Sequence, residues 1–228
     1  MYIIIPILIA IIILTVLFKL YMTYSSKNVF YHGSRDKHQI ALTFDDGPSK
    51  ETLEVIKILK KEKVCATFFV TGKSIEKNPE VFKKLIKSKN EIGNHSYEHR
   101  KLNFLTRKII HNNILLNDQL LNKYKIKTKI FRPPYFLRSW VVDSELKIFN
   151  KKMIICDVIS RDYKNFSPEK VAKIVLKNIK NGSIVDFHDF AYGIGEMRHV
   201  SSALGIIIKE LKKQGYKFVT VSEMLGFR

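Results

Sequence analysis

Apolar and polar positions along this chain form short apolar runs that alternate with amphipathic stretches from about residue 37 onward. The runs are apolar throughout rather than at every second position, which is typical of strands covered on both faces. Between them, as in residues 51–63, apolar residues recur at the three- and four-residue spacing of a helix face. This pattern predicts seven or eight β/α alternations built on a parallel sheet.

End signals place the individual elements. Pro79 opens one predicted helix, and Ser167 with Pro168 caps and opens another that stops at Gly182. About 190 residues are few for eight full units, so we predict a compact, irregular (β/α) barrel rather than an open doubly wound sheet. The strands are predicted within 38–44, 64–72, 91–96, 127–135, 153–160 and 183–189, and the helices within 51–63, 79–90, 106–123, 139–152, 167–182 and 201–215. Residues 216–225 close the chain.

The N-terminus is strongly apolar. Residues 2–18, YIIIPILIAIIILTVLF, contain no charged residue and are just long enough to cross a bilayer core as one helix. No basic residue precedes this run and no small-x-small cleavage site follows it, which disfavours a cleaved signal peptide. We therefore predict a single transmembrane anchor over 1–20, a linker over 21–36 and one folded domain over 37–228.

Charge narrows the range of partners. With 40 Lys and Arg against 21 Asp and Glu, the chain has a formal net charge of +19. This excess suits an anionic membrane or an acidic wall polymer, or it is a solvated lysine-rich surface. No cluster of basic residues with interleaved aromatics stands out, so we expect no specific nucleic-acid partner. Basic residues follow the apolar run but do not precede it, which favours a cytoplasmic domain.

Titratable residues follow one predicted strand after another. Because the site of a β/α barrel lies at the C-terminal ends of its strands, these residues are expected to converge. The segments that follow the strands contain Asp45 and Asp46, then His95 and His99, then Arg132 with Pro133, Pro134 and Tyr135, then Arg161 with Asp162 and Tyr163, and finally His188 with Asp189.

The histidine pair points to a metal. His95 and His99 are four residues apart, so one helical turn would place both imidazoles on one side. Two imidazoles and a carboxylate make the three-ligand set of a catalytic zinc, with one position left for water. Of the adjacent Asp45 and Asp46, one would ligate the ion and the other would take the proton of that water. The sequence thus predicts one divalent metal ion, with Zn²⁺ as the best match.

Five short motifs now stand in order along the chain: TFDDG, HSYEH, RPPY, SRDY and IVDFHD. From about residue 38 to the C-terminus, the chain resembles the polysaccharide deacetylase (NodB homology) family of carbohydrate esterases. The resemblance implies a barrel of that family's type and a carbohydrate polymer or oligomer as substrate. It also implies metal-dependent hydrolysis of the N-acetyl group of an amino sugar in a peptidoglycan- or chitin-like glycan.

The resemblance also implies residue roles. Asp45 would be the general base, oriented by Arg132, and Asp162 would in turn hold Arg132. His188 would protonate the leaving amine, and the backbone N–H of Tyr135 would stabilise the oxyanion. Metal binding is implied for Asp46, His95 and His99, and substrate contact for Pro134, Tyr135, Tyr163 and Asp186.

Two motifs depart from the family pattern. The fourth usually reads Asp-x-x-Asp-Trp, whereas 159–163 read Ile-Ser-Arg-Asp-Tyr, so the first acid is missing and Tyr163 stands for the tryptophan. The fifth usually has leucine where this chain has Asp186, which strand alternation places on the same face as His188. Asp186 either replaces the acid missing at Ile159, or changes the acyl pocket, for instance toward formyl, or reflects lost activity.

The family resemblance implies an extracytoplasmic domain, because glycan polymers of this kind lie outside the cell, and this conflicts with the charge around the apolar run. Two alternative functions stay open. One is a deacylase or deformylase of a lipid-linked sugar, and the other is a catalytically inactive glycan-binding homologue.

Overall fold

The computed structural model describes residues 4–24, 28–164, 166–190 and 200–227. At the centre of its sheet, β2 (Gln39–Asp45) pairs in parallel with β3 (Thr67–Val70) on one side and β8 (Ile184–His188) on the other. The remaining strands are β1 (Val29–Phe30), β4 (Glu91–Asn94), β5 (Ile130–Phe131), β6 (Lys152–Ile154), β7 (Val158–Ile159) and β9 (Lys217–Phe218). Their order is β1-β6-β5-β4-β3-β2-β8-β7, and β9 pairs with the start of β2.

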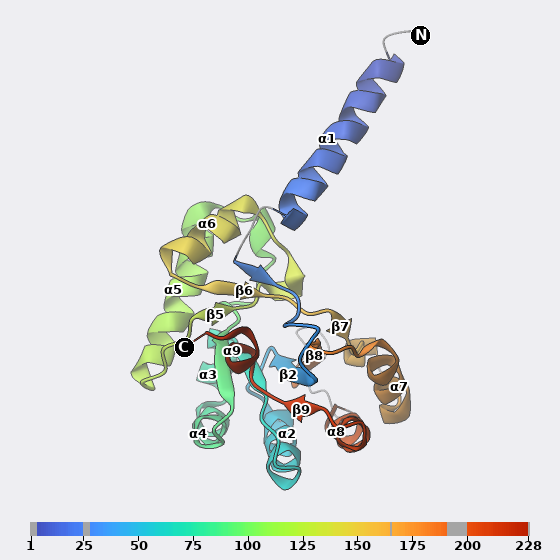
Figure 1. Cartoon of the computed structure of the whole chain (residues 1–228). Coiled ribbons are helices and arrows are strands. Elements are labelled where there is room, and N and C mark those ends of the chain that lie inside the picture. Colours follow the sequence, from blue (N-terminus) through green and yellow to red (C-terminus); the bar gives the residue numbers. More distant parts are fainter. Residues whose placement is uncertain (1–3, 25–27, 165, 191–199, 228) are drawn as a thin grey trace.

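Helices surround this sheet (Figure 1). Helix α2 shows why they form where they do: Ser49 caps its first turn with a capping box, and Val55 and Leu59 are buried against the sheet. The α-helices of the domain are α2 (Lys50–Lys61), α3 (Gly72–Lys77), α4 (Pro79–Lys87), α5 (Arg107–Lys123), α6 (Trp140–Ile148), α7 (Pro168–Asn178), α8 (Val200–Lys213) and α9 (Val221–Leu225). Short 3-10 turns are η1 (Leu102–Phe104), η2 (Pro134–Phe136) and η3 (Asp162–Lys164).

The strands are buried on both faces, as their unbroken apolar runs predict. On the helix side, Phe44 stacks on Phe68 and Phe187, with ring centroids 4.9 and 5.5 Å away. On the inner side, Ala41 and Ile184 belong to a second apolar cluster. This double burial confirms the parallel β/α arrangement.

One predicted strand divides into two. Residues 153–160 read as a single apolar run, but they form the end of β6 and then β7, which lie far apart in the strand order. Val158 follows Ile154 by four positions, so at most about 14 Å separates them. The sheet is therefore curled into a half-barrel whose two edges approach each other. The edge strand β1 comes from the segment predicted as a linker, and it pairs with β6.

Helix α1 (Ile4–Tyr24) projects away from the domain (Figure 1). Its large apolar side chains from Ile5 to Leu17 are 50–64% exposed. No helix within the described residues has both the length and the apolar character that a membrane crossing requires. Residues 2 and 3 of the predicted span lie outside the described residues.

Candidate active site

The Asp-Asp-Gly turn after β2 brings both carboxylates into the interior. Asp45 ends the strand, and Asp46 has a left-handed backbone (φ 76) that turns the chain sharply. Both residues are buried, and the carbonyl oxygen of Asp46 accepts a hydrogen bond from Ser74 Oγ at 2.8 Å. A Cβ on Gly47 would collide with the carboxylate of Asp189, so any other residue there would have to displace this buried side chain.

A tight loop after β4, not a helical turn, brings the two histidines together, which corrects the sequence-based expectation. Ser96 and His99 have left-handed backbones (φ 67 and 55). Asn94 Oδ1 accepts from the backbone N–H of Ser96, and Ser96 Oγ accepts from that of His99. Hydrogen bonds from polar side chains at the strand end thus fix this loop, and the loop brings the two histidines together as a helical turn would have done.

Asp46, His95 and His99 form a compact group of potential metal ligands. His95 Nδ1 donates to the carbonyl oxygen of Arg132 at 2.7 Å, so Nε2 directs its lone pair at Asp46 Oδ1, 3.2 Å away. His99 Nε2 lies 3.0 Å from the same oxygen. Asp46 Oδ1 has no hydrogen-bond donor among the described residues. Buried acceptors that face one another need a cation between them, and this donor set fits a divalent metal ion.

The pKa shifts of Asp46 and His99 agree with a role in metal binding. Burial raises the pKa of Asp46, but interaction with the imidazoles of His95 and His99 outweighs it and leaves the pKa below its usual range. Burial lowers the pKa of His99, although Asp46 opposes this shift. The group therefore favours an ionised carboxylate with a neutral imidazole, the forms that ligate metals.

Arg132 holds Asp45 in place. Its guanidinium is fully buried, and Nη1 donates to Asp45 Oδ1 at 2.7 Å and to Thr43 Oγ1 at 2.6 Å. Nη2 and Nε donate to the carbonyl oxygens of Ile155 and Ile154 at 3.0 and 3.3 Å. The side chain thus lies where β6 ends and the link to β7 begins, and it ties β2 to that edge.

Asp162 makes no hydrogen bond or ion pair with Arg132 among the described residues, which corrects the role that the family resemblance implies for this fourth-motif residue. Its carboxylate instead holds His188, with Oδ1 2.9 Å from Nδ1 and Oδ2 2.7 Å from the backbone nitrogen. Burial lowers the pKa of His188, but the carboxylates of Asp186 and Asp162 outweigh burial and raise it well above its usual range. The raised pKa favours the protonated imidazole, which is the form that can donate a proton.

Asp186 lies next to Ile159 in the β7–β8 register. Its Oδ1 is 3.4 Å from Arg132 Nη1, and this contact is what a replacement for the missing acid requires. Its Oδ2 has no hydrogen-bond partner among the described residues. Burial, reinforced by Asp45, raises the pKa of Asp186 well above its usual range, against the opposing charges of His188 and Arg132.

Asp186→Asn is expected to stabilise the fold in a pH-dependent way. A raised folded-state pKa means that ionised Asp186 destabilises the protein once the pH exceeds the unfolded-state pKa of about 3.9. The difference in free energy of unfolding between variant and wild type should grow by about 1.4 kcal/mol per pH unit above that value until the folded-state pKa is reached. Denaturant unfolding from pH 4 to 8 measures it, and a difference that does not change with pH would contradict the expectation.

These groups surround one cavity of about 510 Å³. Tyr163 forms an exposed aromatic wall with its ring 5.7 Å from that of His188, and the ring of Tyr135 lies 4.7 Å from that of His99. The cavity thus has the metal-ligand group at one part of its wall and the Asp162–His188 pair at another. Its lining comprises Asp45, Asp46, His95, His99, Tyr135, Phe136, Ile159, Tyr163, Asp186 and His188.

Comparison with known proteins identifies the family. A family model described as polysaccharide deacetylase matches residues 32–150. The chain is also 35% identical over 192 residues to a peptidoglycan-N-acetylglucosamine deacetylase of Bacillus cereus, a match that covers 83% of this chain and 89% of that protein. The chain belongs to the polysaccharide deacetylase family. The resemblance carried by the five motifs is thereby confirmed.

Solved polysaccharide deacetylases share the fold. The crystal structure of the Bc1960 peptidoglycan N-acetylglucosamine deacetylase superposes with a TM-score of 0.84 at 30% identity, over 88% of this chain and 94% of that one. A pseudoenzyme of the CE4 family from Bacillus anthracis superposes with a TM-score of 0.81 at 27% identity, over 87% of this chain and 69% of that one. The shared fold therefore includes proteins with and without activity, and the site residues must decide between them.

Several supporting residues were missed by sequence reasoning. Thr43 lies two positions before Asp45, and strand alternation could have placed both on one face. Thr52 Oγ1 donates to the Asp189 carboxylate, which packs against Gly47. Burial raises the pKa of Asp189 to about 7, although the bond from Thr52 opposes it. No local sequence signal marks this last contact, because it joins segments that are far apart in the chain.

Proposed function

We propose that this protein is a metal-dependent N-deacetylase that hydrolyses the N-acetyl group of an amino sugar in a peptidoglycan- or chitin-like glycan. The observation that carries the proposal is the grouping of a metal-ligand set, Asp45 and His188 around one cavity. Such a constellation supplies a base, an acid and an electrophile, whereas glycan binding alone needs neither the base nor the acid.

Asp45 is placed to activate the attacking water. Arg132 holds its Oδ1, and its Oδ2 lies 3.8 Å from His95 Nε2, on the side of the metal-ligand group. Because both Asp45 and Arg132 are buried and tied to neighbouring strands, the carboxylate keeps one orientation. Oδ2 is therefore the atom that accepts the proton of the water attacking the acyl carbon.

The donor set favours zinc as the resident ion. One carboxylate and two imidazoles, with room for a further ligand, are typical of catalytic zinc. When bound, such an ion would lower the pKa of a water molecule and polarise the acyl oxygen of the substrate. The backbone N–H of Tyr135, whose residue has a left-handed conformation (φ 59), is the second proposed donor to the oxyanion. Pro134 precedes it and helps to shape this wall, since it is buried beneath the loop.

His188 is placed to release the product. The amine leaves only if its nitrogen gains a proton. The carboxylates of Asp186 and Asp162 raise the pKa of His188 and so favour the imidazolium that can supply this proton. Asp162 fixes Nδ1, so Nε2 is the atom that faces the cavity and donates. Tyr163 lies beside it as a stacking surface for a sugar ring.

Asp162→Asn is expected to shift the pH dependence of turnover. Removal of this carboxylate charge lowers the pKa of His188, and the reaction needs the protonated form. The alkaline limb of kcat/KM should therefore move to lower pH, by about one unit. A pH–rate profile measures the shift, with exposed Glu169→Gln as the control. An unmoved alkaline limb would show that His188 does not act as the acid.

Acetate release tests the proposed function. The full-length protein in detergent, loaded with zinc, is incubated with N-acetylglucosamine oligomers and with peptidoglycan, and the acetate released is measured with and without chelator. Acetate that depends on the metal supports the proposal. Formate released from an N-formylated lipid-linked sugar, without acetate from either glycan, would favour the deformylase. Metal binding without any hydrolysis would favour the inactive glycan-binding homologue.

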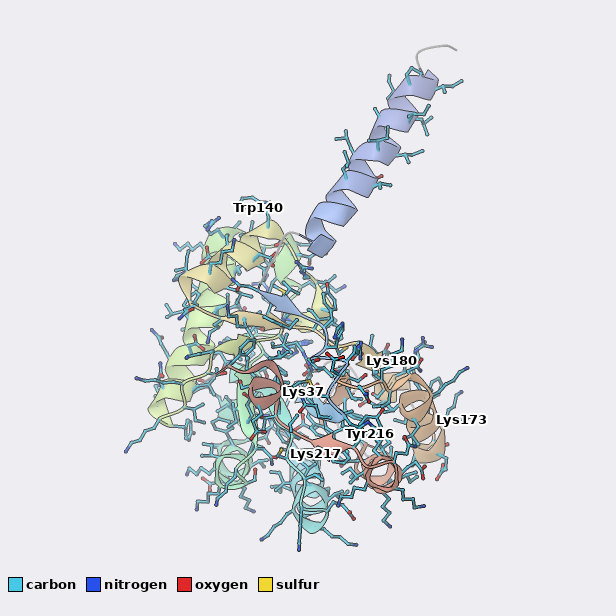
Figure 2. All side chains as sticks on the ribbon, viewed as in Figure 1. Lys37, Trp140, Lys173, Lys180, Tyr216 and Lys217 are labelled. Carbon is cyan, nitrogen blue, oxygen red and sulfur yellow. The ribbon has the colours of Figure 1, made fainter. Side chains whose placement is uncertain are left out.

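We also propose that the apolar run 2–18, which begins before the described residues, anchors the protein in a membrane, with the domain on the extracytoplasmic side. The run 2–18 has no charge, and the side chains from Ile5 to Leu17 are exposed to an extent that is unfavourable for a helix in water. Figure 2 shows Trp140 on α6 at the end of the domain from which α1 projects. Trp140 is 59% exposed with the Arg107 guanidinium 5.8 Å from its ring, a pairing suited to a membrane interface.

Cell fractionation and protease accessibility test the anchor. The full chain should sediment with membranes, and the domain should be cleaved by protease added outside intact spheroplasts. Recovery of the full chain in the soluble fraction would contradict the anchor, and protection of the domain from protease would place it in the cytoplasm.

A further inference from the structure

A second cavity, of about 850 Å³, adjoins the active-site cavity along β7, which is an edge strand of the sheet. Ile159 and Tyr163 line both cavities, so the two cavities are direct neighbours at these side chains. The walls of the second cavity come from β7, the turn that follows it, and α7. We call it the basic groove, because five basic residues line it: Arg161, Lys164, Lys170, Lys173 and Lys177.

The positive charge of the basic groove is not neutralised by the protein. All five basic residues are exposed, and none has an ion-pair partner among the described residues. The described lining contains one carboxylate, Asp157, which already pairs with Arg35 at 2.8 Å and accepts from Ser183 Oγ at 3.0 Å. Uncompensated charges of one sign in a concave surface concentrate ligands of the opposite sign.

Helix α7 aligns three of these cations. Lys170, Lys173 and Lys177 are spaced by three and four residues, so they share one face of the helix and repel one another. The opposite face buries Val171 and Val175 against the core. From Lys170 to Lys177 the row spans about 10 Å along the axis, which is comparable to the length of a disaccharide. Figure 2 shows Lys173 on the outer side of α7.

Two of these basic residues have distinctive local features. Arg161 has a left-handed backbone (φ 59), a conformation that arginine rarely adopts and that is found more often at functional positions. The Nζ of Lys170 lies 3.6 Å from the centroid of the Phe166 ring, which restricts that long side chain. Because the contact with Phe166 already restricts the Lys170 side chain, this cation loses less freedom on binding than a fully solvated lysine does.

We propose that the basic groove binds the carboxylate groups of the same glycan strand whose amino sugar occupies the active-site cavity. The proposal rests on the proposed function, because it assigns the anionic neighbours of the reacting sugar to this groove. A carboxylate source within the strand fits the position of the two cavities on either side of Ile159 and Tyr163. In a peptidoglycan-like strand, every second sugar carries a lactyl group that is extended by a peptide with free carboxylates, whereas a chitin-like strand carries none. The groove would therefore select acidic strands over neutral ones.

Binding to insoluble glycan tests the proposal, because binding does not require turnover. The full-length protein in detergent is sedimented with peptidoglycan sacculi stripped of phosphate polymers, and with the same sacculi after amidation of their carboxyl groups. The groove variant is Lys170→Glu with Lys173→Glu. The matched control is Lys84→Glu with Lys87→Glu on α4, which makes the same change in net charge at the same helical spacing on exposed residues that have no ion-pair partner among those described.

The groove variant should bind the acidic sacculi about tenfold more weakly than wild type, and the control variant should stay within about twofold. Amidation should weaken wild-type binding to the level of the groove variant, and added salt should act in the same direction. Equal losses in the two double variants, or no effect of amidation, would overturn the proposal. So would a loss that appears only on sacculi that keep their phosphate polymers. Failure of acetate release with this binding pattern intact would refute the catalytic proposal alone.

Discussion

Replacing Asp45 with asparagine is expected to lower kcat for acetate release by about 10³-fold while metal binding is kept. Asparagine has the same shape and still accepts the hydrogen bond from Arg132 Nη1, but its amide cannot take a proton from water. The loss should therefore appear in kcat rather than in KM, because the missing interaction acts only in the transition state. Steady-state kinetics together with the metal content of the purified variant measure both parts.

Exposed Asp36→Asn serves as the control for Asp45→Asn, since it makes the same chemical change on the surface. A kcat within tenfold of wild type would show that another group activates the water. Loss of the metal from the Asp45 variant would instead make Asp45 a ligand, and its 3.8 Å distance from His95 Nε2 would then reflect a shared ion.

Asp46→Asn is expected to abolish acetate release through loss of the metal, with affinity lowered by at least about 100-fold. Changes to residues that merely support metal ligands cost 10- to 100-fold, and Asp46 is placed to bind directly through Oδ1. Asparagine tolerates the left-handed backbone at this position (φ 76), so the turn itself should survive. Competition with a metal indicator measures the affinity, and excess metal should restore part of the activity.

The two adjacent substitutions control one another. Each replaces a buried aspartate of the same turn by asparagine, but Asp45→Asn should keep the metal and lose turnover, whereas Asp46→Asn should lose the metal first. Identical metal affinities in the two variants would refute the division of roles. The two variants also distinguish an active deacetylase from an inactive homologue, because a difference in kcat between wild type and Asp45→Asn can be measured only in an active enzyme.

Asp186 stands where the family resemblance predicts a leucine. Its contact with Arg132 and its place beside Ile159 meet the geometric requirement for a relocated acid. Its unpartnered Oδ2 in the wall of the cavity is equally relevant to the acyl pocket. Comparison of acetyl and formyl substrates with Asp186→Leu distinguishes the two, because a gain in acetyl hydrolysis would exclude the relocated acid.

The sequence by itself determined the alternation of parallel strands and helices, the family, and the residues of the candidate site. These features are readable because apolar runs report burial of their own side chains, and because strand ends of a β/α barrel meet on one face. Only the tertiary structure decided that Asp162 holds His188 rather than Arg132, and that residues 153–160 form two strands at distant places in the sheet. It also showed that a loop, not a helical turn, brings His95 and His99 together, and that α7 and β7 enclose a basic groove. The physical reason is that such contacts depend on strand order and on the curl of the sheet, which no local pattern of residues encodes.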